Sequence, residues 1–591
     1  MGVKSLLLAV TSALVGQASA QGYYSVGYGY ACYAYGSWST VGGGSYNYNY
    51  APYSTIGGGH SNYIYAYTAN ILGGMSNSCY APYAHDNGGH CLRNFNDWGS
   101  IDGGYWNYNY GYMATIGGGG YSYTYSYYDS IVGGSYHRVY YYYSTVSTGH
   151  NHYAISYTGT VVGGMYNSAY YGSYSTAQGG YSNVASAPHS TVVAGYDNYA
   201  GGYASFVGAG QYNGAYGYAS TIGGGWYNQV YASWSAVGGG YANRPYGTAS
   251  FILSGSSHIL YSAYSTIANG HDATLYGYSS TVGGGKYNTA YSDYSTVTGG
   301  WSNNAMTDYS TVAGGYSQYV GGYAGYIGGG YTNGAYNTYT TIAGGRACYA
   351  YGYAASIGGG FESTAYGSYS TIGGGYDNAV YGYASGAFSG YNNYVNGYTS
   401  YVGGGYANDA YADFAVVSGG AYNYANADWS SVGGGYDNQN YGSYSTVLGG
   451  NQNDIYGAYA VIAGGKLNKV YSDYAFVGGG YYNTAMGDYA AVGGGGSNKA
   501  LSNYAAVVGG YGNKASARFA TIIGGAQNVA SGRYGVALGY YAKAIGDYSV
   551  AIGLNSDSSS PCSVSDDYTI GICADAFVVD GNDIYDLLSS R

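Results

Sequence analysis

The side chains in this sequence that are best suited to chemistry are phenols. Tyrosine accounts for 95 of the 591 residues, and a ring recurs eight or nine residues after the last glycine of nearly every glycine cluster. Rings one strand spacing apart, ~4.8 Å, lie within the range for offset stacking. We therefore predict an aromatic ladder that stabilises the stack and makes oligomer contacts, with an exposed adhesive or cross-linkable phenol surface as the alternative. Its members are Tyr203, Tyr218, Trp234, Tyr294, Tyr353, Tyr369, Tyr383, Trp429 and Tyr474.

The aromatic ladder takes two sequence forms. In one, the ring precedes an alanine, as in Tyr203-Ala204, and in the other it follows a small or acidic residue, as in Asp473-Tyr474. We expect the choice of form to decide which face of the coil carries the ring.

Asparagine forms a second periodic set, three residues after the last glycine of each cluster. Stacked amides hydrogen-bond along a column of strands, and asparagine tolerates left-handed corners. We interpret this set as a structural ladder and not as a ligand site. Its members are Asn213, Asn228, Asn288, Asn378, Asn408, Asn438 and Asn468.

The six cysteines of the chain invite pairing if the protein is exported. Cys562 and Cys573 would close a short loop near the C-terminus, and Cys79 and Cys91 lie on adjacent repeats. Cys32 and Cys348 are about 21 repeats apart, or ~100 Å at one strand spacing per repeat, which is far beyond disulfide reach. We expect these last two cysteines to be free or paired between chains.

Catalytic and metal-binding patterns are not found in the sequence. His85, Asp86, His90 and Cys91 form the only loose cluster of metal-ligand residue types, and their spacing matches no standard ligand pattern. The glycine clusters lack the Lys-Ser/Thr that completes a phosphate-binding loop. We expect no enzyme activity, no cofactor and no metal. The sequence has no N-glycosylation sequon, which leaves O-glycosylation of its hydroxyl-rich faces open.

Charge and hydropathy narrow the partners and the location. The net charge of −11 is dilute, and no basic stripe is present that would bind nucleic acid. Lys4, the apolar run Leu6 to Val15 and the small residues Ala18 to Ala20 have the pattern of a secretory signal peptide over residues 1–20. No other apolar run approaches the ~20 residues of a membrane span. The predicted location is secreted, extracellular or at the cell surface.

A fixed period organises the chain between residues 21 and 553. The last glycine of each cluster, which we call the marker glycine, recurs at the spacing that separates Gly44 from Gly59. One extra residue stands at Tyr170-Tyr171, and the two final steps, to Gly539 and Gly553, are each one residue shorter. About 36 such coils indicate a solenoid in which each repeat contacts its neighbours.

Each coil has room for two short strands and two tight corners, and no helical period is present. In the coil Tyr366 to Tyr383 we expect a strand over Tyr369 to Ile372, a glycine turn and a second short strand or arm through Asn378. The predicted fold is an all-β parallel β-solenoid, or β-roll, ~170 Å long. Residues 554–591 depart from the pattern and are predicted to form a C-terminal cap.

The coils of the pattern SxxSTVGGGxxNxAxGxYSTVxGG, and especially the final ones, SGRYGVALGYYAKAIGDYSVAIGLNS from Ser531 to Ser556, resemble the head repeats of YadA-type trimeric autotransporter adhesins. The resemblance covers most of the chain after residue 20. The resemblance implies a left-handed parallel β-roll, a homotrimer and the binding of host or surface components. This chain differs from that family in its mostly longer coils, in its far higher tyrosine content and in ending without a coiled-coil stalk or membrane anchor. The narrow core of each coil also favours oligomerisation.

Two classes of function follow from these observations. The first is a structural or adhesive fibre of the cell surface or extracellular matrix, with tyrosine ladders for self-assembly or for contact with glycans or surfaces. The second is a protein that binds a periodic target, either ice or a polysaccharide, through regular rows of hydroxyl groups and rings. A solenoid lyase would need a clustered acid and base in a groove, and the sequence contains no such cluster.

Overall fold

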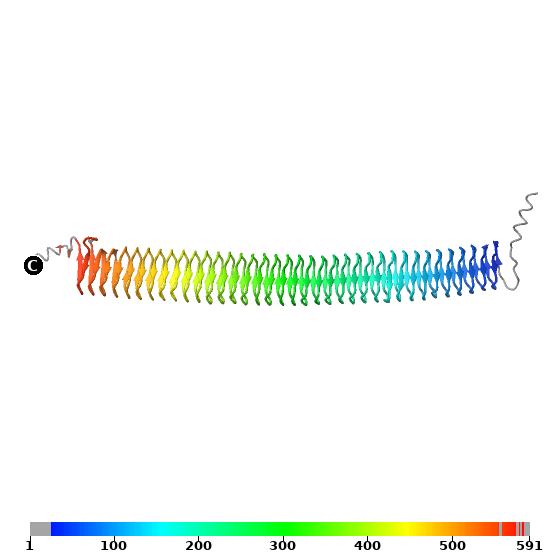
Figure 1. Cartoon of the computed structure of the whole chain (residues 1–591), viewed down its shortest axis with the longest axis horizontal. Helices are drawn as coiled ribbons and strands as arrows, with labels where there is room; N and C mark the ends of the chain where they lie inside the picture. The colour runs from blue at the N-terminus through cyan, green and yellow to red at the C-terminus, as the bar shows by residue number, and fades with distance from the viewer. Residues whose placement is uncertain (1–24, 555–557, 575–577, 580–581, 584–591) are drawn as a thin grey trace, which may run out of the picture. The chain divides into compact units, whose positions relative to one another are not determined.

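The structure is a computed structural model that describes residues 25–554, 558–574, 578–579 and 582–583. The predicted signal peptide, residues 1–20, and part of the predicted cap lie outside these residues. The chain is an all-β parallel β-solenoid of about 35 turns with a ~15-residue period, as predicted. It divides into two compact units, Met1–Gly299 and Gly300–Arg591, and in each unit successive coils stack in chain order (Figure 1).

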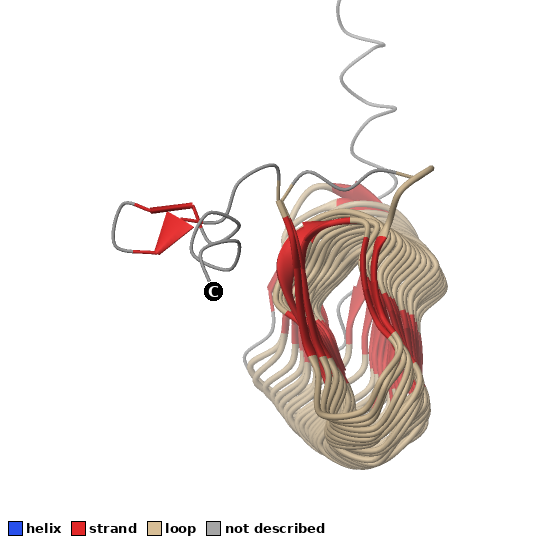
Figure 2. Cartoon of the chain, turned by 90° about the vertical axis from the view of Figure 1, so that its left-hand side faces the viewer, coloured by secondary structure: helices blue, strands red, loops and turns tan. Residues whose placement is uncertain are grey.

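Each coil contributes one strand to each of two parallel rows. In the coil that follows Gly375 these strands are β50 (Ala379–Val380) and β51 (Gly386–Ala387). Most other strands are residue pairs at the same two positions of their coils. Seen along the stack, the coils of a unit overlie one another as a flattened ring with strands on opposite sides (Figure 2).

The N-terminal unit contains two strand rows. Row one begins with β1 (Ser25–Val26), β4 (Thr40–Val41) and β7 (Thr55–Ile56) and reaches β39 (Thr296–Val297). Row two runs from β3 (Tyr33–Ala34) to β30 (Gln229–Val230) and resumes at β32 (Arg244–Pro245). The interruption coincides with Pro245, which has no N–H to donate to the neighbouring strand.

The C-terminal unit repeats this arrangement. Row one runs from β41 (Thr311–Val312) to β75 (Ile570–Cys573), and row two from β40 (Asn304–Ala305) to β74 (Cys562–Val564). Within the predicted cap, β74 pairs with β72 (Ala542–Ala544) and β75 pairs with β73 (Val550–Gly553), which adds one more coil to the stack. Two further strands, β76 (Val578–Val579) and β77 (Asn582–Asp583), form an antiparallel pair.

Five residues per coil face inward. In the coil after Gly375 they are Asn378, Val380, Gly382, Ser385 and Ala387, and all five are buried. The sequence predicts a core of little more than one valine or isoleucine and two small residues per turn, with serine or alanine among the small ones, and the structure adds an asparagine to it. The core is therefore partly polar, and its polar groups need partners inside the coil.

Both corners of a coil use left-handed backbone. Asp377 and Ala384, two and nine residues after Gly375, have φ values of 52° and 51°, and equivalent residues in nearly all described coils share this conformation although they are not glycine. Gly375 itself has φ +101°, and a Cβ there would lie 2.0 Å from the Gly390 carbonyl oxygen, so only glycine fits. Tyr369 lies at a left-handed corner with φ 58°. The predicted strand Tyr369 to Ile372 is therefore too long, and the strand is β49 (Thr371–Ile372).

The extra residue at Tyr170-Tyr171 is absorbed locally. Strand β22 (Ser168–Tyr170) has three residues and pairs with β20 (Tyr153–Ile155) in the usual register, but its pairing with β24 (Val184–Ala185) is one residue out of step. Tyr171 takes φ 50° and is 76% exposed. The insertion is thus a bulge of the second row, and the coils after it regain the regular register.

Within the described ranges, no helix has the length and apolar character needed to cross a membrane.

Candidate binding surface

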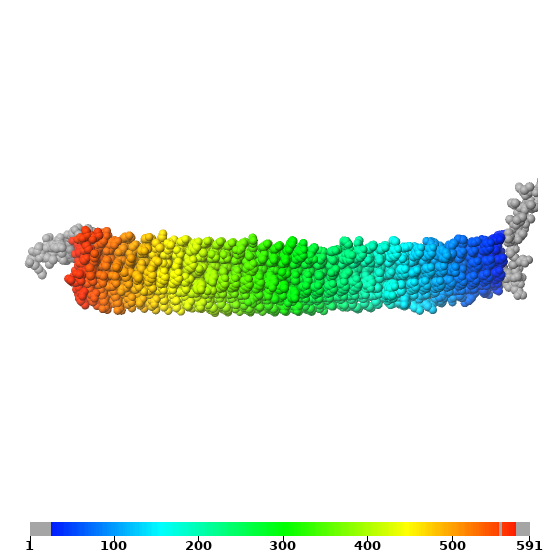
Figure 3. Space-filling model, in the orientation of Figure 1, coloured from blue at the N-terminus to red at the C-terminus, as the bar shows by residue number. Residues whose placement is uncertain are grey.

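Tyrosine side chains form an interrupted row beside the second strand row. They stand six residues after the marker glycine, and we call them the strand-side row. Tyr336, Tyr351, Tyr366 and Tyr381 stack with ring centroids 4.7, 5.1 and 4.4 Å apart and interplanar angles of 5° to 11°. Because strand side chains alternate, these rings point outward while residues five and seven positions after the marker glycine point inward. The rows of side chains give the visible face an evenly ribbed surface (Figure 3).

The aromatic ladder predicted from the sequence lies at the second corner of the coil, and we call it the corner row. Its predicted members are all more than a third exposed, between 38% and 59%. In the ring-first form the alanine occupies the left-handed position, and in the ring-second form the ring residue occupies it, as with Ala204 and Tyr474. The members placed at this corner are Tyr203, Tyr218, Trp234, Tyr294, Tyr353, Tyr369, Tyr383, Trp429 and Tyr474.

The choice of form sets ring orientation and not the face that carries the ring, which corrects the sequence-based expectation. Neighbours of the same form stack, as Tyr459 and Tyr474 do at 4.9 Å and 4°. Neighbours of different form meet edge to face, as Tyr353 and Tyr369 do at 5.4 Å and 69°. A one-residue shift across a left-handed corner turns the Cα–Cβ direction but leaves the ring at the same corner, so both arrangements remain favourable aromatic contacts.

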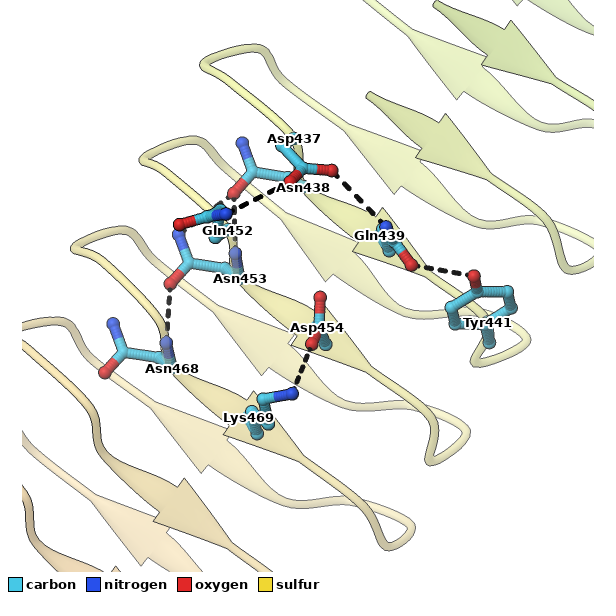
Figure 4. Close-up of polar contacts among 9 residues, drawn as sticks. All are labelled: Asp437, Asn438, Gln439, Tyr441, Gln452, Asn453, Asp454, Asn468 and Lys469. Atoms are coloured by element: carbon cyan, nitrogen blue, oxygen red, sulfur yellow. Dashed lines mark hydrogen bonds and ion pairs between the residues drawn. The ribbon is translucent and has the colours of Figure 1, made fainter. Parts of the chain in front are cut away.

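The asparagine ladder lies inside the coil. Asn453 is fully buried, and its Nδ2 donates to the Gly449 and Gly465 carbonyl oxygens at 3.0 Å each. Its Oδ1 accepts the backbone N–H of Asn468 at 3.0 Å, and its own N–H donates to Asn438 Oδ1 at 3.0 Å (Figure 4). Each asparagine therefore fastens the glycine corner of its own coil to the next coil. The predicted members Asn213, Asn228, Asn288, Asn378, Asn408, Asn438 and Asn468 are all buried at this position.

The first strand row presents a different surface. Its outward position is most often threonine, and Thr266, Thr281 and Thr296 lie in direct register on successive strands. Two residues further along each coil the side chain is often absent or small, as at Gly283 and Ala268. Phe206 and Phe251 replace threonine in the same row. The result is a hydroxyl row broken by single aromatic residues and, as at Ala236 and Val416, by aliphatic ones.

The N-terminal unit buries several ionisable side chains. Asp86 lies between Ile71 and Ile101 in the core column, and burial raises its pKa to about 8. His137 and His152 replace asparagine in the ladder and stack at 4.9 Å. Burial, with a smaller contribution from His152, lowers the pKa of His137 to about 4. Neither residue has its Nε2 hydrogen-bonded. The two histidines therefore connect neighbouring coils by fewer hydrogen bonds than the asparagines do.

The cysteines are only partly paired. Cys562 and Cys573 form a disulfide that joins β74 to β75, whereas the predicted pairing of Cys79 with Cys91 is wrong, because both are free and buried. Cys79 stacks in the strand column between Ile64 and Asn94, while Cys91 lies at a left-handed corner with φ 56°. Cys32 and Cys348 are also free and buried.

The cluster of metal-ligand types around His85 and His90 does not form a site. Asp86 points into the core, whereas His85 on the same strand is exposed. Among the described residues, no three His, Cys, Asp or Glu side chains come together in a way that would hold a metal ion.

Polar residues interrupt the tyrosine surface over Tyr391 to Tyr471 of the C-terminal unit. Gln439 Nε2 and Gln452 Nε2 each donate to Asp437 at 3.3 Å, and the Tyr441 hydroxyl donates to Gln439 Oε1 at 2.8 Å (Figure 4). Lys469 Nζ lies 2.9 Å from Asp454 Oδ2, and this contact raises the pKa of Lys469. All these groups stand on or beside the outward face of row two.

A hollow of about 390 Å³ opens over the three coils before this network. Asn392, Tyr394, Ala407, Asp409, Tyr411 and Tyr424 line it. Asp409 stands between Tyr394 and Tyr424 in the strand column, and burial raises its pKa to about 6. A second hollow of about 280 Å³ shares Tyr424 and is lined by Tyr422, Tyr436, Asp437, Gln439 and Tyr441.

The geometry of the last coils coincides with a family match. Residues 530–556 match the YadA head domain repeat in two copies. No curated protein sequence matches the chain. The family model thus confirms the resemblance for these last coils, where the chain carries adhesin-like repeats.

The head repeats fall where the coil shortens by one residue. Strands β69 (Thr521–Ala526) and β71 (Val536–Tyr540) pair with a register shift between Ile522 and Gly524. The residue that is lost belongs to the glycine turn, so the strand runs through the corner without a break, and β73 pairs with β71 over four residues. The head repeats therefore extend the same two rows as the longer coils.

Sequence reasoning did not find Asp409, Asp454 or Lys469. All three occupy the fourth position after a marker glycine, where tyrosine is common. Once the register is known, a charged residue in a column of tyrosines indicates a candidate site. Its neighbours in space, however, lie a whole coil away in the sequence on either side, so the signal is not visible within any short motif.

Proposed function

We propose that this chain is an exported structural or adhesive fibre protein of the cell surface or extracellular matrix. The observation that supports it is the aromatic surface: strand-side and corner rows of half-exposed rings repeat at one-coil spacing. Exposed aromatic patches of this extent are typical of interaction surfaces. An adhesin-like repeat solenoid is a structural kind of protein.

Self-association is the first role proposed for these rings. The resemblance to YadA head repeats implies a trimer, and stacked phenols bury large apolar areas when two such surfaces meet. Exposed tyrosines are also substrates for oxidative coupling, in which a peroxidase with hydrogen peroxide removes one hydrogen atom from each of two phenols and a carbon–carbon bond forms. We propose contact first and coupling as a later reinforcement.

Light scattering on the mature secreted chain tests the self-association. We expect the mass of three chains, and we expect substitution of Tyr459, Tyr474 and Tyr489 by serine to lower it towards one chain. Substitution of Thr371, Thr446 and Thr311 by serine on the first strand row is the control and should leave the mass unchanged. A single-chain mass for the unmodified protein at all concentrations contradicts the proposal.

A periodic target is the second candidate function. The in-register threonines Thr145, Thr160, Thr176 and Thr191 support it, since regular hydroxyl groups fit a repeating lattice or polysaccharide. Thermal hysteresis of a freezing solution tests whether the chain binds ice. A pull-down on insoluble polysaccharides tests whether it binds a polysaccharide. If the threonine row binds ice or a polysaccharide, replacing these threonines by valine should abolish the thermal hysteresis or the pull-down. A wild-type chain that is inactive in both assays rejects this function.

A further inference from the structure

Asp409 is a carboxylate in a gap of the tyrosine surface. Its two column neighbours, Tyr394 and Tyr424, are paired with it in direct register on strands β52 (Tyr394–Val395) and β56 (Tyr424–Ala425). These two rings are therefore two strand spacings apart, ~9.6 Å, with the shorter aspartate between them. Tyr411 of the same coil and Asn392 and Ala407 complete the lining of the hollow of about 390 Å³ above it.

The Asp409 carboxylate is held in this hollow without a counter-charge. Within the described residues no ion pair or side-chain hydrogen bond engages it, and burial alone raises its pKa to about 6. The titratable groups around it are tyrosines: Tyr394 and Tyr424 on the adjoining coils and Tyr411 on its own. Burial and the Asp409 carboxylate both raise the pKa of Tyr424, so that phenol stays neutral. The hollow thus contains one negative charge at neutral pH.

The chain shows elsewhere how each part of this hollow binds a cation. At the equivalent strand position, Asp454 accepts the ammonium group of Lys469, its column neighbour, at 2.9 Å (Figure 4). Arg138, again at this position, stands between Tyr123 and Tyr153, with its Cζ 6.0 and 5.7 Å from the two ring centroids. A carboxylate with a cation and a cation between two rings are therefore both stable arrangements in this column.

We propose that the hollow over Asp409 is a binding site for an alkylammonium group. A cation centred between the Tyr394 and Tyr424 rings would lie ~4.8 Å from each, inside the ~6 Å range of cation–π attraction, and directly above the carboxylate. Tyr411 closes a third side. The inference rests on the proposed function, because it names the chemistry that one part of the contact surface would recognise.

Titration of the mature chain with butylammonium chloride, followed by calorimetry, tests the site, and butanol is the uncharged probe of the same size. We expect saturable binding of butylammonium and at least tenfold weaker binding of butanol. Because the carboxylate form binds the cation, affinity should fall as the pH is lowered through about 6. Equal binding of the two probes overturns the proposal, since it would indicate an apolar hollow only.

Two variants and one control locate the site. Asp409→Asn keeps the size of the side chain and should weaken butylammonium binding at least tenfold, and Tyr394→Leu should weaken it severalfold. Asp437→Asn alters the neighbouring hollow, whose carboxylate already accepts two amide hydrogen bonds, and should leave binding unchanged. Unchanged binding by D409N with a native circular dichroism spectrum overturns the assignment.

The carrier of the ammonium group is identified by two further pairs of probes, glucosamine against N-acetylglucosamine and Nα-acetyl-lysine amide against Nα-acetyl-norleucine amide. In each pair the member that carries the side-chain or sugar ammonium should bind more tightly, and the tighter of the two shows whether a sugar or a peptide is the better source. Self-association of the chain is measured separately by its mass. A trimer that does not bind butylammonium rejects this inference alone, and a monomer that does bind it rejects the proposed assembly alone.

Discussion

At the scale of single residues, the corners of the coil hold the least expected feature. Two residues per coil adopt the left-handed conformation, and most of them are tyrosine, alanine, serine or aspartate. For an L-residue with a Cβ this conformation costs roughly 1–2 kcal/mol. The ring contacts of the corner rows offset part of this cost where the residue is aromatic, but an alanine at the same place gains no such contact.

Ala384→Gly is therefore expected to stabilise the C-terminal unit by about 0.5–1 kcal/mol, because the relief at φ 51° exceeds the extra entropy of an unfolded glycine. Denaturant unfolding of the variant measures it. Ala379→Gly is the matched control, since Ala379 lies in strand β50, and it should destabilise by about 0.5–1 kcal/mol. Destabilisation by both changes would refute the account of the corners.

Asn453→Ala is expected to destabilise the C-terminal unit by about 2–4 kcal/mol. The change removes the donors to the Gly449 and Gly465 carbonyl oxygens and the acceptor for the Asn468 N–H, all of which are buried. Denaturant unfolding checks this value. Gln439→Ala on the outward side of the same coils should change stability by no more than ~0.5 kcal/mol. If Asn453→Ala changes the free energy of unfolding as little as Gln439→Ala does, the ladder amides do not stabilise the fold.

At the scale of coils and strands, the neighbours of a substituted residue are the residues at the same position of the two adjacent coils. A residue at a given position always stacks on its equivalents in the two neighbouring coils, so a foreign residue changes a column and not an isolated site. His137 and His152 in the asparagine column and Asp86 in the isoleucine column are the clearest cases. Each makes the N-terminal unit sensitive to pH in its own way.

Replacing His137 and His152 together by asparagine should remove an acid sensitivity. Burial lowers the pKa of His137 to about 4, so its contribution to stability is complete above the unfolded pKa of ~6.5 and is lost as the pH falls towards 4. Relative to the double variant, the wild type should lose about 2 kcal/mol through His137 between pH 7.5 and 5, and a further amount through His152. Urea unfolding at both pH values measures this difference. Parallel pH profiles would contradict it.

Asp86→Val should act in the opposite direction. The folded pKa of about 8 lies above the unfolded value of ~3.9. The stability of the wild type is therefore fullest below pH 4 and falls as the pH rises towards 8. The variant should gain on the order of 3 kcal/mol more over the wild type at pH 8 than at pH 5. Asp97→Val, a corner change on the adjacent coil, is the control, and a pH-independent gain from Asp86→Val would argue against a buried carboxyl.

The period, the two strand rows and the absence of a helical pattern could be predicted from the spacing of glycines, because a strand, a corner and a return strand leave few other ways to use so short a repeat. The left-handed corners could not, since tyrosine and alanine carry no signal for that conformation. The depth of Asn378 was also missed, because asparagine at a turn is usually exposed. The neighbours of Asp409, Tyr394 and Tyr424, could be identified only after the strand register was known.

At the scale of the whole molecule, contacts between neighbouring coils dominate. Every parallel strand pairing within a unit joins residues one coil apart, as between Thr364 and Ala379, so stability is close to a sum of local terms. Damage should therefore stay local. We expect Asn453→Ala to speed amide hydrogen exchange at Val447, Ile462 and their adjoining strands and to leave exchange at Ile342 of the same unit unchanged. Uniform acceleration across the unit would show a single cooperative block instead.

The repeat of the register has a consequence for the gene. Since each position meets its equivalents one coil away, an in-frame gain or loss of one whole coil restores every column wherever its breakpoints fall within the coil. Single-residue changes can be absorbed locally, as at Tyr171 and in the glycine turns of the last coils, but a larger change that is not a whole number of coils would place tyrosines in the core column and isoleucines in the solvent. Alleles that differ in length by whole repeats are thus the form of variation that this architecture tolerates best.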